Sequence, residues 1–230
     1  MIHLLLSFLL LAQGNAQDLY NQAVKLYRGV DGPKDVYKAA ELFQTAAEAG
    51  HADAQFMLAV LYITGEGVPE QVVKAAEWYT KAAEQGHVEA QFNIGVLYVN
   101  GIGVRLDFVK AGEWFSKAAS QGSASAEFNL SMMHLRGDGF AKNLQKAAEF
   151  MLSAAEKGLP IAQYHLGIMY SNGEGVSRDL VQAYKWADLA VKSPDAAAPD
   201  LRDFLANMMT SAQVVEAQRM SSEWKPKTKQ

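Results

Sequence analysis

Residues 74–86 read KAAEWYTKAAEQG, and this stretch decides the fold because it returns at a fixed interval. Close copies are KAAELFQTAAEAG at residues 38–50, KAGEWFSKAASQG at 110–122 and KAAEFMLSAAEKG at 146–158, so each copy starts 36 residues after the last. A fixed period between 20 and 50 residues is typical of one small unit stacked on copies of itself. Such an array exposes an elongated surface rather than a closed pocket, which favours binding over catalysis.

Each repeat is predicted to contain two helices, since its apolar residues fall at i, i+3, i+4 and i+7. The expected N-caps of the first helices are Asp35, Gln71, Asp107, Asn143 and Asp179. The glycines expected to end those helices with a positive φ are Gly50, Gly86, Gly122 and Gly158. The second helices are expected to start after His51, His87, Ser123 and Leu159, and Pro160 then takes the first helical position.

A pair of glycines follows each second helix, as in Gly65 and Gly67 or Gly101 and Gly103. A dinucleotide-binding fingerprint needs a strand before such a pair and a third glycine that opens a helix. Here a helix comes first and the pair recurs four times, so the pairs are predicted to be turns. Large side chains are expected to fill the core beside small alanines, namely Trp78, Trp114, Phe150 and Trp186 in the first helices and Tyr62, Tyr98 and Tyr170 in the second.

The two ends of the array depart from the repeat. Residues 18–29 read as a lone second helix, Pro199 opens a degenerate helix to about Met209, and Thr210 with Gln213 forms a capping box for a last helix. The predicted fold is therefore all-α, a right-handed α/α superhelical solenoid of about twelve helices. It covers residues 17–224, with capping helices at both ends and units near 36–71, 72–107, 108–143 and 144–179.

Residues 1–16 are predicted to be a signal peptide for export. The run from Ile2 to Ala12 is almost wholly apolar, and Gly14 and Ala16 place small residues at −3 and −1 of a cleavage site. The run is too short to span a bilayer, so no stable membrane span is expected after its removal. Residues 225–230 read as a basic, disordered tail.

These repeats resemble the Sel1-like repeat family, relatives of the tetratricopeptide repeats, over roughly residues 18–192. The resemblance is carried by the A-A-x-W/F-x-x-x-A-A-x-x-G helix and by the G-x-G-V loop at residues 65–68, 101–104 and 173–176. The segment 209–226, which ends in Glu-Trp-Lys-Pro, looks like the ending of many bacterial members. The resemblance implies an α/α superhelix that binds proteins or peptides, and bacterial members often act in the envelope or in host contact.

Composition argues against several classes of site. The formal charge is −4 and no dense basic patch is present, which disfavours nucleic acid as a partner. The chain has no cysteine, so disulfides, thiolate metal sites and a cysteine nucleophile are excluded. No histidine has a partner at metal-ligand spacing. We expect no cofactor and no metal.

The remaining polar residues read as structural. Each of Glu41, Glu77, Glu113 and Glu149 follows a lysine by three residues, which predicts local ion pairs rather than paired catalytic carboxylates. Ser123 and Ser131 occupy positions where the repeat uses small residues, and no Ser/His/Asp arrangement stands out.

Two columns of variable residues are the candidate ligand-binding positions. The first column is Tyr37, Val73, Val109, Gln145 and Val181. The second, two turns on, is Gln44, Thr80, Ser116, Leu152 and Asp188, of which Thr80 and Ser116 are the chosen candidates. If the first helices line the concave side, both columns lie along its groove. The alternative is that the apolar column belongs to the core between repeats.

The sequence thus predicts a non-enzymatic scaffold of the bacterial envelope, periplasmic or secreted, that binds a protein or peptide in its concave groove. One alternative is a cell-wall-associated enzyme that binds or hydrolyses β-lactams, since some exported Sel1-like proteins are associated with that activity. Those members carry a disulfide in each repeat, and this chain has none. Another alternative is a cytosolic regulator with a spurious N-terminal extension.

Overall fold

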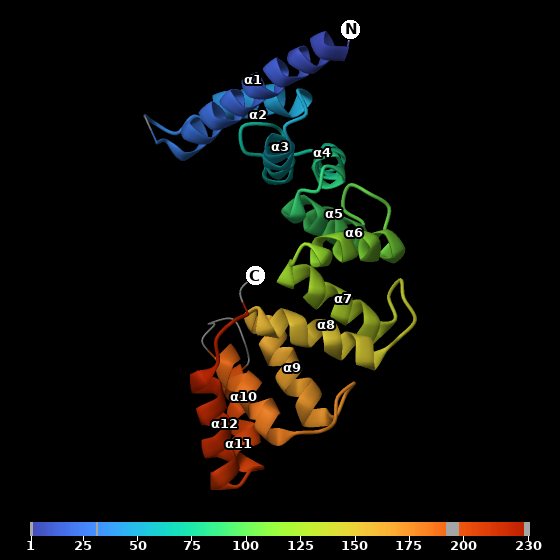
Figure 1. Ribbon diagram of the computed structural model, residues 1–230, viewed down its shortest axis with the longest axis vertical. Coiled ribbons are helices and arrows are strands. Elements are labelled where there is room, and N and C mark those ends of the chain that lie inside the picture. The colour runs from blue at the N-terminus through green and yellow to red at the C-terminus, as the bar shows by residue number, and fades with distance from the viewer. Residues whose placement is uncertain (1, 31, 192–197, 228–230) are drawn as a thin grey trace. The chain divides into compact units, whose positions relative to one another are not determined.

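The computed structural model describes residues 2–30, 32–191 and 198–227, with side chains from residue 15 onward. This part of the chain forms helices joined by turns and contains no strand (Figure 1). The first six helices are α1 (Ile2–Arg28), α2 (Val36–Glu48), α3 (Ala52–Thr64), α4 (Val72–Glu84), α5 (Val88–Asn100) and α6 (Phe108–Ser120). The next six are α7 (Ala124–Arg136), α8 (Leu144–Glu156), α9 (Pro160–Asn172), α10 (Leu180–Ala190), α11 (Ala198–Asn207) and α12 (Ser211–Glu223). The predicted all-α fold of about twelve helices is confirmed.

The chain divides into two compact units, residues 1–114 and 115–230. In the first unit, each helix from α1 to α5 packs on its neighbour in the chain. In the second unit, α7 to α10 pack in the same sequential way, and α10 also contacts both α11 and α12. Contacts between successive helices are what a repeat array requires.

The helix starts follow the predicted caps. The carboxylate of Asp35 accepts a hydrogen bond from the backbone N–H of Lys38, while Gln71 makes no side-chain cap bond. Nδ1 of His51 accepts the backbone N–H of Ala54, and Nδ1 of His87 does the same in the next repeat. Leu159 offers no polar cap, and Pro160 follows it at the first helical position.

Glycine has a positive φ at three points of each repeat, and two of them show how the repeat packs. Gly50 and Gly86, which follow the first helices, have φ values of +92° and +91°. Gly67 and Gly103, the second members of the loop pairs, also have positive φ and lie against the carbonyls of Val36 and Val72. A Cβ at these two loop positions would collide with that backbone, so each loop is held on the start of a first helix.

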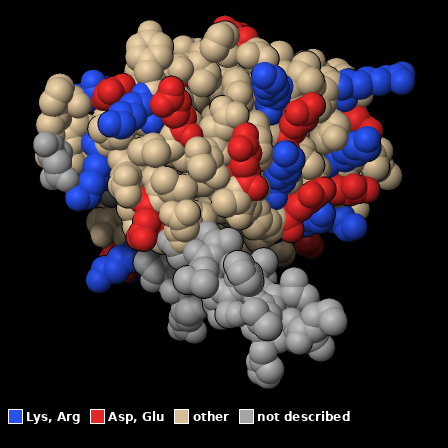
Figure 2. All heavy atoms as spheres, turned by 90° about the horizontal axis from the view of Figure 1, so that it is seen from above, with Lys and Arg blue, Asp and Glu red and all other residues tan. Residues whose placement is uncertain are grey.

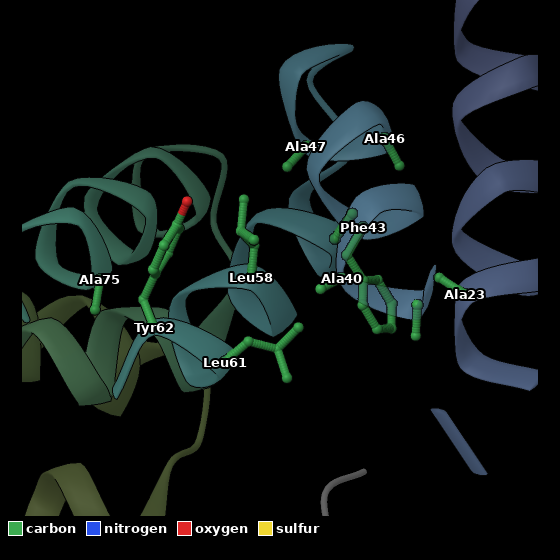
Figure 3. Close-up of a cluster of buried hydrophobic side chains, with 11 residues drawn as sticks. Ala23, Ala40, Phe43, Ala46, Ala47, Leu58, Leu61, Tyr62 and Ala75 are labelled. Atoms are coloured by element: carbon green, nitrogen blue, oxygen red, sulfur yellow. The ribbon is translucent and has the colours of Figure 1, made fainter. Parts of the chain in front are cut away.

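The core is built from alanines at the helix crossings and one large side chain in each first helix. Figure 3 shows Phe43 of α2 beside Ala23 of α1, with Leu58 and Leu61 of α3 in the same cluster. The deeply buried column is Phe43, Tyr79, Phe115 and Met151. Of the first-helix rings that the sequence favoured, Trp186 is buried as expected. Trp78, Trp114 and Phe150 are only half-buried, because the residue that follows each of them is the one that faces the core.

Candidate binding surface

The first candidate column is solvent-exposed along most of its length. Tyr37, Val73 and Val109 are 73%, 57% and 55% exposed, and Gln145 is exposed as well. Val181 alone is half-buried, against the cluster around Leu205 and Ala217. These exposures disagree with the alternative that the apolar column is core between repeats. Apolar side chains left in water at the same position of successive helices are suited to contact a partner.

The second column lies on the same helix face, because positions seven residues apart fall on one side of a helix. Ser116 is exposed, and Thr80 is half-buried with its hydroxyl donating to the carbonyl of Ala76 at 2.8 Å. In the second unit, the C-terminal part of the chain covers this column. The hydroxyl of Ser221 donates to Asp188 at 2.6 Å, and Leu152 packs in the cluster that contains Trp224.

Within each unit, we call the surface formed by the members of these two columns and the glutamates between and beyond them the first-helix face. In α2 it comprises Tyr37, Glu41, Gln44 and Glu48, all exposed. In α4 the corresponding residues are Val73, Glu77, Thr80 and Glu84, of which Thr80 is half-buried.

The predicted lysine–glutamate pairs on this face do not form among the described residues. Instead, the ammonium of Lys74 lies 5.4 Å from the ring centroid of Tyr62, and that of Lys110 lies 5.5 Å from Tyr98. A cation over an aromatic face is stabilised by the quadrupole of the ring. Because the lysines turn toward the tyrosines, Glu77 and its equivalents in the other repeats leave their carboxylates exposed to solvent.

An open cleft of about 600 Å³ adjoins the face in the second unit and is lined by Leu152, Glu156, Tyr170, Lys185 and Trp186, among others. Burial lowers the pKa of Lys185, and the negative charge of Glu156 opposes that effect. The indole Nε1 of Trp186 is buried without a hydrogen-bond partner in the described residues. A cleft of about 590 Å³ recurs in the first unit at the equivalent position, beside Tyr98 and Lys110.

The serines and histidines that could carry chemistry have structural roles. Ser131 is fully buried and donates to the carbonyl of Ala147 at 2.6 Å, while Ser123 caps α7. The ring of His165 lies 5.5 Å from Phe128, and burial lowers the pKa of His165. Among the residues that the structure describes, no group of three or more His, Asp or Glu could hold a metal ion.

Charges are mixed on the surface seen in Figure 2, where lysine and arginine alternate with aspartate and glutamate. The phosphate backbone of a nucleic acid is bound by clustered lysine and arginine side chains, and the surface seen in Figure 2 shows no such cluster. None of the described helices is both long and apolar enough to cross a bilayer.

A family model named Sel1 repeat matches five consecutive segments, residues 19–51, 52–87, 88–123, 124–159 and 160–195. The chain belongs to the Sel1-repeat family. Each of the four matches between residues 52 and 195 is 36 residues long. Each match begins with a second helix and continues through the first helix that follows it. Sel1 repeats generally mediate protein–protein interactions and are generally non-catalytic.

Solved structures of other Sel1-repeat proteins share this fold. A protective antigen of uropathogenic Escherichia coli with an SLR fold is 39% identical, with a TM-score of 0.85. The match covers 92% of this chain but only 45% of the antigen, so the chain spans less than half of that relative. A Sel1-repeat protein from Oxalobacter formigenes is 28% identical over 95% of this chain and 88% of its own, with a TM-score of 0.80.

An immunity protein from Pseudomonas aeruginosa is 20% identical over 90% of this chain and 83% of its own, with a TM-score of 0.51, and shares the fold alone. No curated protein matches the chain.

Proposed function

We propose that this Sel1-repeat protein is a non-enzymatic scaffold that binds a protein or peptide on its first-helix face. The observation that carries the proposal is the exposure of Tyr37, Val73 and Val109 at one position of three successive first helices. The cores of both units are closed by other residues, so folding does not require these side chains to be apolar. The surface is also pre-formed, which lowers the ordering cost of binding.

The experiment is a pull-down from a bacterial envelope extract with the wild-type chain and with Val109→Lys. We expect the variant to lose at least about 1 kcal/mol of binding free energy, the scale of a central interface contact. Its urea unfolding should match that of the wild type, because Val109 is 55% exposed in the free protein. If Val109→Lys retains the same partners with the same affinity, the first column is not the binding surface.

We further propose that residues 1–16 direct export and are removed, which places the mature protein in the periplasm or outside the cell. The side chain of Gln17 already contacts the repeat array, since its Oε1 lies 3.0 Å from Nε2 of His51. The 39% identical relative is a protective antigen, which accords with a location in the envelope or outside the cell. N-terminal sequencing should find Gln17 first, and a retained Met1 on cytosolic protein would refute export.

A further inference from the structure

The C-terminal segment of the chain lies on the C-terminal end of α8 and against α10. After α12, residues 224–227 continue without helical structure, and the ring of Trp224 meets Trp186 of α10 edge-on at 6.1 Å and 74°. The backbone N–H of Lys227 donates to the carbonyl of Glu156, the last residue of α8, at 2.7 Å. The ammonium of Lys227 also lies 2.7 Å from the Glu156 carboxylate. Of residues 225–230, which the sequence predicts to be a disordered tail, 225–227 are described by the structure and 228–230 lie outside the described residues.

Three features of the C-terminal end of α8 favour binding of this segment. We call the site formed by Glu156, Gly158 and Trp186 the seat. The last carbonyls of a helix have no intrahelical donor, so an extended chain can supply one. The Glu156 carboxylate adds a charge-assisted contact to the incoming lysine. Gly158 lets the chain approach closely, since a Cβ there would lie 3.4 Å from Cβ of Pro226. The site thus binds a segment with an aromatic residue, a closely packed proline, and a lysine three positions after the aromatic residue.

The first unit contains an equivalent of this site, with Gln44 and Lys81 where the second unit has Leu152 and Leu189. Counting back 108 residues from Glu156, Gly158 and Trp186 gives Glu48, Gly50 and Trp78. Gly50 has φ +92°, close to the +87° of Gly158, and an added Cβ there would meet nothing within 4 Å. In the described residues, no backbone N–H donates to the Glu48 carbonyl. Trp78 is half-buried, whereas Trp186, under the C-terminal segment, is only 2% exposed.

The charge around the empty seat favours a basic occupant. Glu41, Glu48, Glu77 and Glu84 all lie exposed on this part of the first-helix face. The Glu48 carboxylate accepts a hydrogen bond from the exposed side-chain amide of Gln44 at 2.9 Å, which an incoming lysine would replace or share. The ammonium of Lys81 rests 3.7 Å from the ring centroid of Trp78, so this ring already attracts a cation. Lys81 is exposed, and its flexible side chain can turn away when another group arrives.

We propose that Glu48, Gly50 and Trp78 form a seat for an extended, basic segment of another protein, in which an aromatic residue is followed three positions later by a lysine. The aromatic residue packs on Trp78, the lysine binds the Glu48 carboxylate, and its backbone N–H donates to the Glu48 carbonyl. This inference rests on the proposed function and names the chemistry of the ligand.

The test uses a dye-labelled peptide with the sequence of residues 222–230, SEWKPKTKQ, titrated with the full-length chain and followed by fluorescence anisotropy. We expect Glu48→Lys to weaken binding at least tenfold. The matched control is Glu70→Lys, which makes the same charge change at an exposed loop position of the same unit and should bind as the wild type does. A peptide with alanine in place of its tryptophan should also bind at least tenfold more weakly.

Other outcomes overturn the inference. If Glu156→Lys abolishes binding while Glu48→Lys does not, the peptide only exchanges with the chain's own C-terminal segment. If the full-length chain forms a dimer that Glu48→Lys abolishes, the occupant is a second copy rather than another protein. If Glu48→Lys has no effect on the peptide but Val109→Lys still loses partners in the pull-down, this seat is wrong while the proposed function stands.

Discussion

The ring of His134 stacks on the ring of Phe140, with centroids 4.7 Å apart and planes 22° from parallel. These two residues mark where the third unit, residues 108–143, departs from the others. Tyr62, Tyr98 and Tyr170 occupy the position of His134, and valines occupy the position of Phe140. In the other repeats the same two positions share a hydrophobic cluster, as Tyr98 and Val104 do. The two departures therefore touch each other, and the larger Phe140 fills space beside the smaller imidazole.

The first prediction concerns this pair. We expect His134→Tyr and Phe140→Val each to destabilise the fold, because each leaves the other side chain without its matched neighbour. The double variant restores the arrangement of the other repeats, so its loss should be smaller than the sum of the single losses by about 0.5–1.5 kcal/mol. Urea unfolding of the four proteins measures this coupling, and strictly additive losses would contradict it.

The second prediction separates two kinds of glycine. Gly86→Ala should cost on the order of 1 kcal/mol, since φ is +91° and the added Cβ meets nothing within 4 Å. Gly86→Asn should cost less, because asparagine tolerates the left-handed region. Gly103→Ala should cost roughly 1–3 kcal/mol more than Gly86→Ala, because its Cβ collides with the carbonyl of Val72. Equal urea midpoints for the two alanine variants would contradict this account.

The third prediction concerns a buried acid. Gln55, Gln91 and Gln163 donate from their side-chain amides to carbonyls of the preceding first helix, and Glu127 replaces them in the third position. Glu127 cannot donate, and its Oε1 instead accepts from Lys157 at 2.7 Å and Ser153 at 2.8 Å.

Lys157→Ala should therefore destabilise the wild type by about 1–3 kcal/mol, since it leaves a buried carboxylate unpaired and Lys157 itself is partly solvent-screened. The same change made in a Glu127→Gln background should cost much less, because no buried charge remains. Thermal unfolding of this double-mutant cycle is the measurement, and an unchanged cost in the second background would show that Lys157 acts through packing alone.

The fourth prediction concerns pH. Burial, together with the positive charge of Arg136, lowers the pKa of His165, so the folded protein binds a proton there less readily than the unfolded chain does. The stability contributed by the neutral ring is complete above the unfolded pKa of about 6.5. It is lost as the pH falls from that value through the lower folded pKa.

His165→Phe keeps a ring beside Phe128 and removes the titration. Between pH 7.5 and 5.5, the urea midpoint of the wild type should therefore fall further than that of the variant. Parallel pH profiles for the two proteins would exclude His165 as the cause.

The sequence predicted the parts of this fold that depend on neighbouring residues. Caps such as Asp35 and His51 act within three residues of themselves, so their positions were correct. The register of the core was harder, because the periodic pattern allows either Trp78 or Tyr79 to face inward, and only packing between helices selects Tyr79. The lysines were misassigned for a similar reason, since Tyr62 is distant from Lys74 in the chain but adjacent to it in the fold.

The exposure of the first column could be predicted from the sequence, and its role in binding stays a prediction. The exposed first column followed from its variability between repeats, but the seat beneath the C-terminal segment did not. The contact between Lys227 and Glu156 joins residues 71 positions apart, and no local pattern reports a contact of that range. The recurrence of Glu48, Glu84 and Glu156 at one position was the available signal, together with the aromatic and basic residues that end the chain.

Gly67, Gly103 and Gly175 each lie against the carbonyl of the first residue of the preceding first helix. These contacts limit how such a protein can change in length during evolution. A small insertion in one of these loops would lift the glycine from the carbonyl that it touches. Gain or loss of a whole 36-residue unit would instead keep an equivalent glycine–carbonyl contact in every remaining repeat. Duplication or deletion in steps of one repeat is therefore the tolerated route. The antigen of uropathogenic Escherichia coli, of which this chain spans 45%, shows the same fold in a much longer protein.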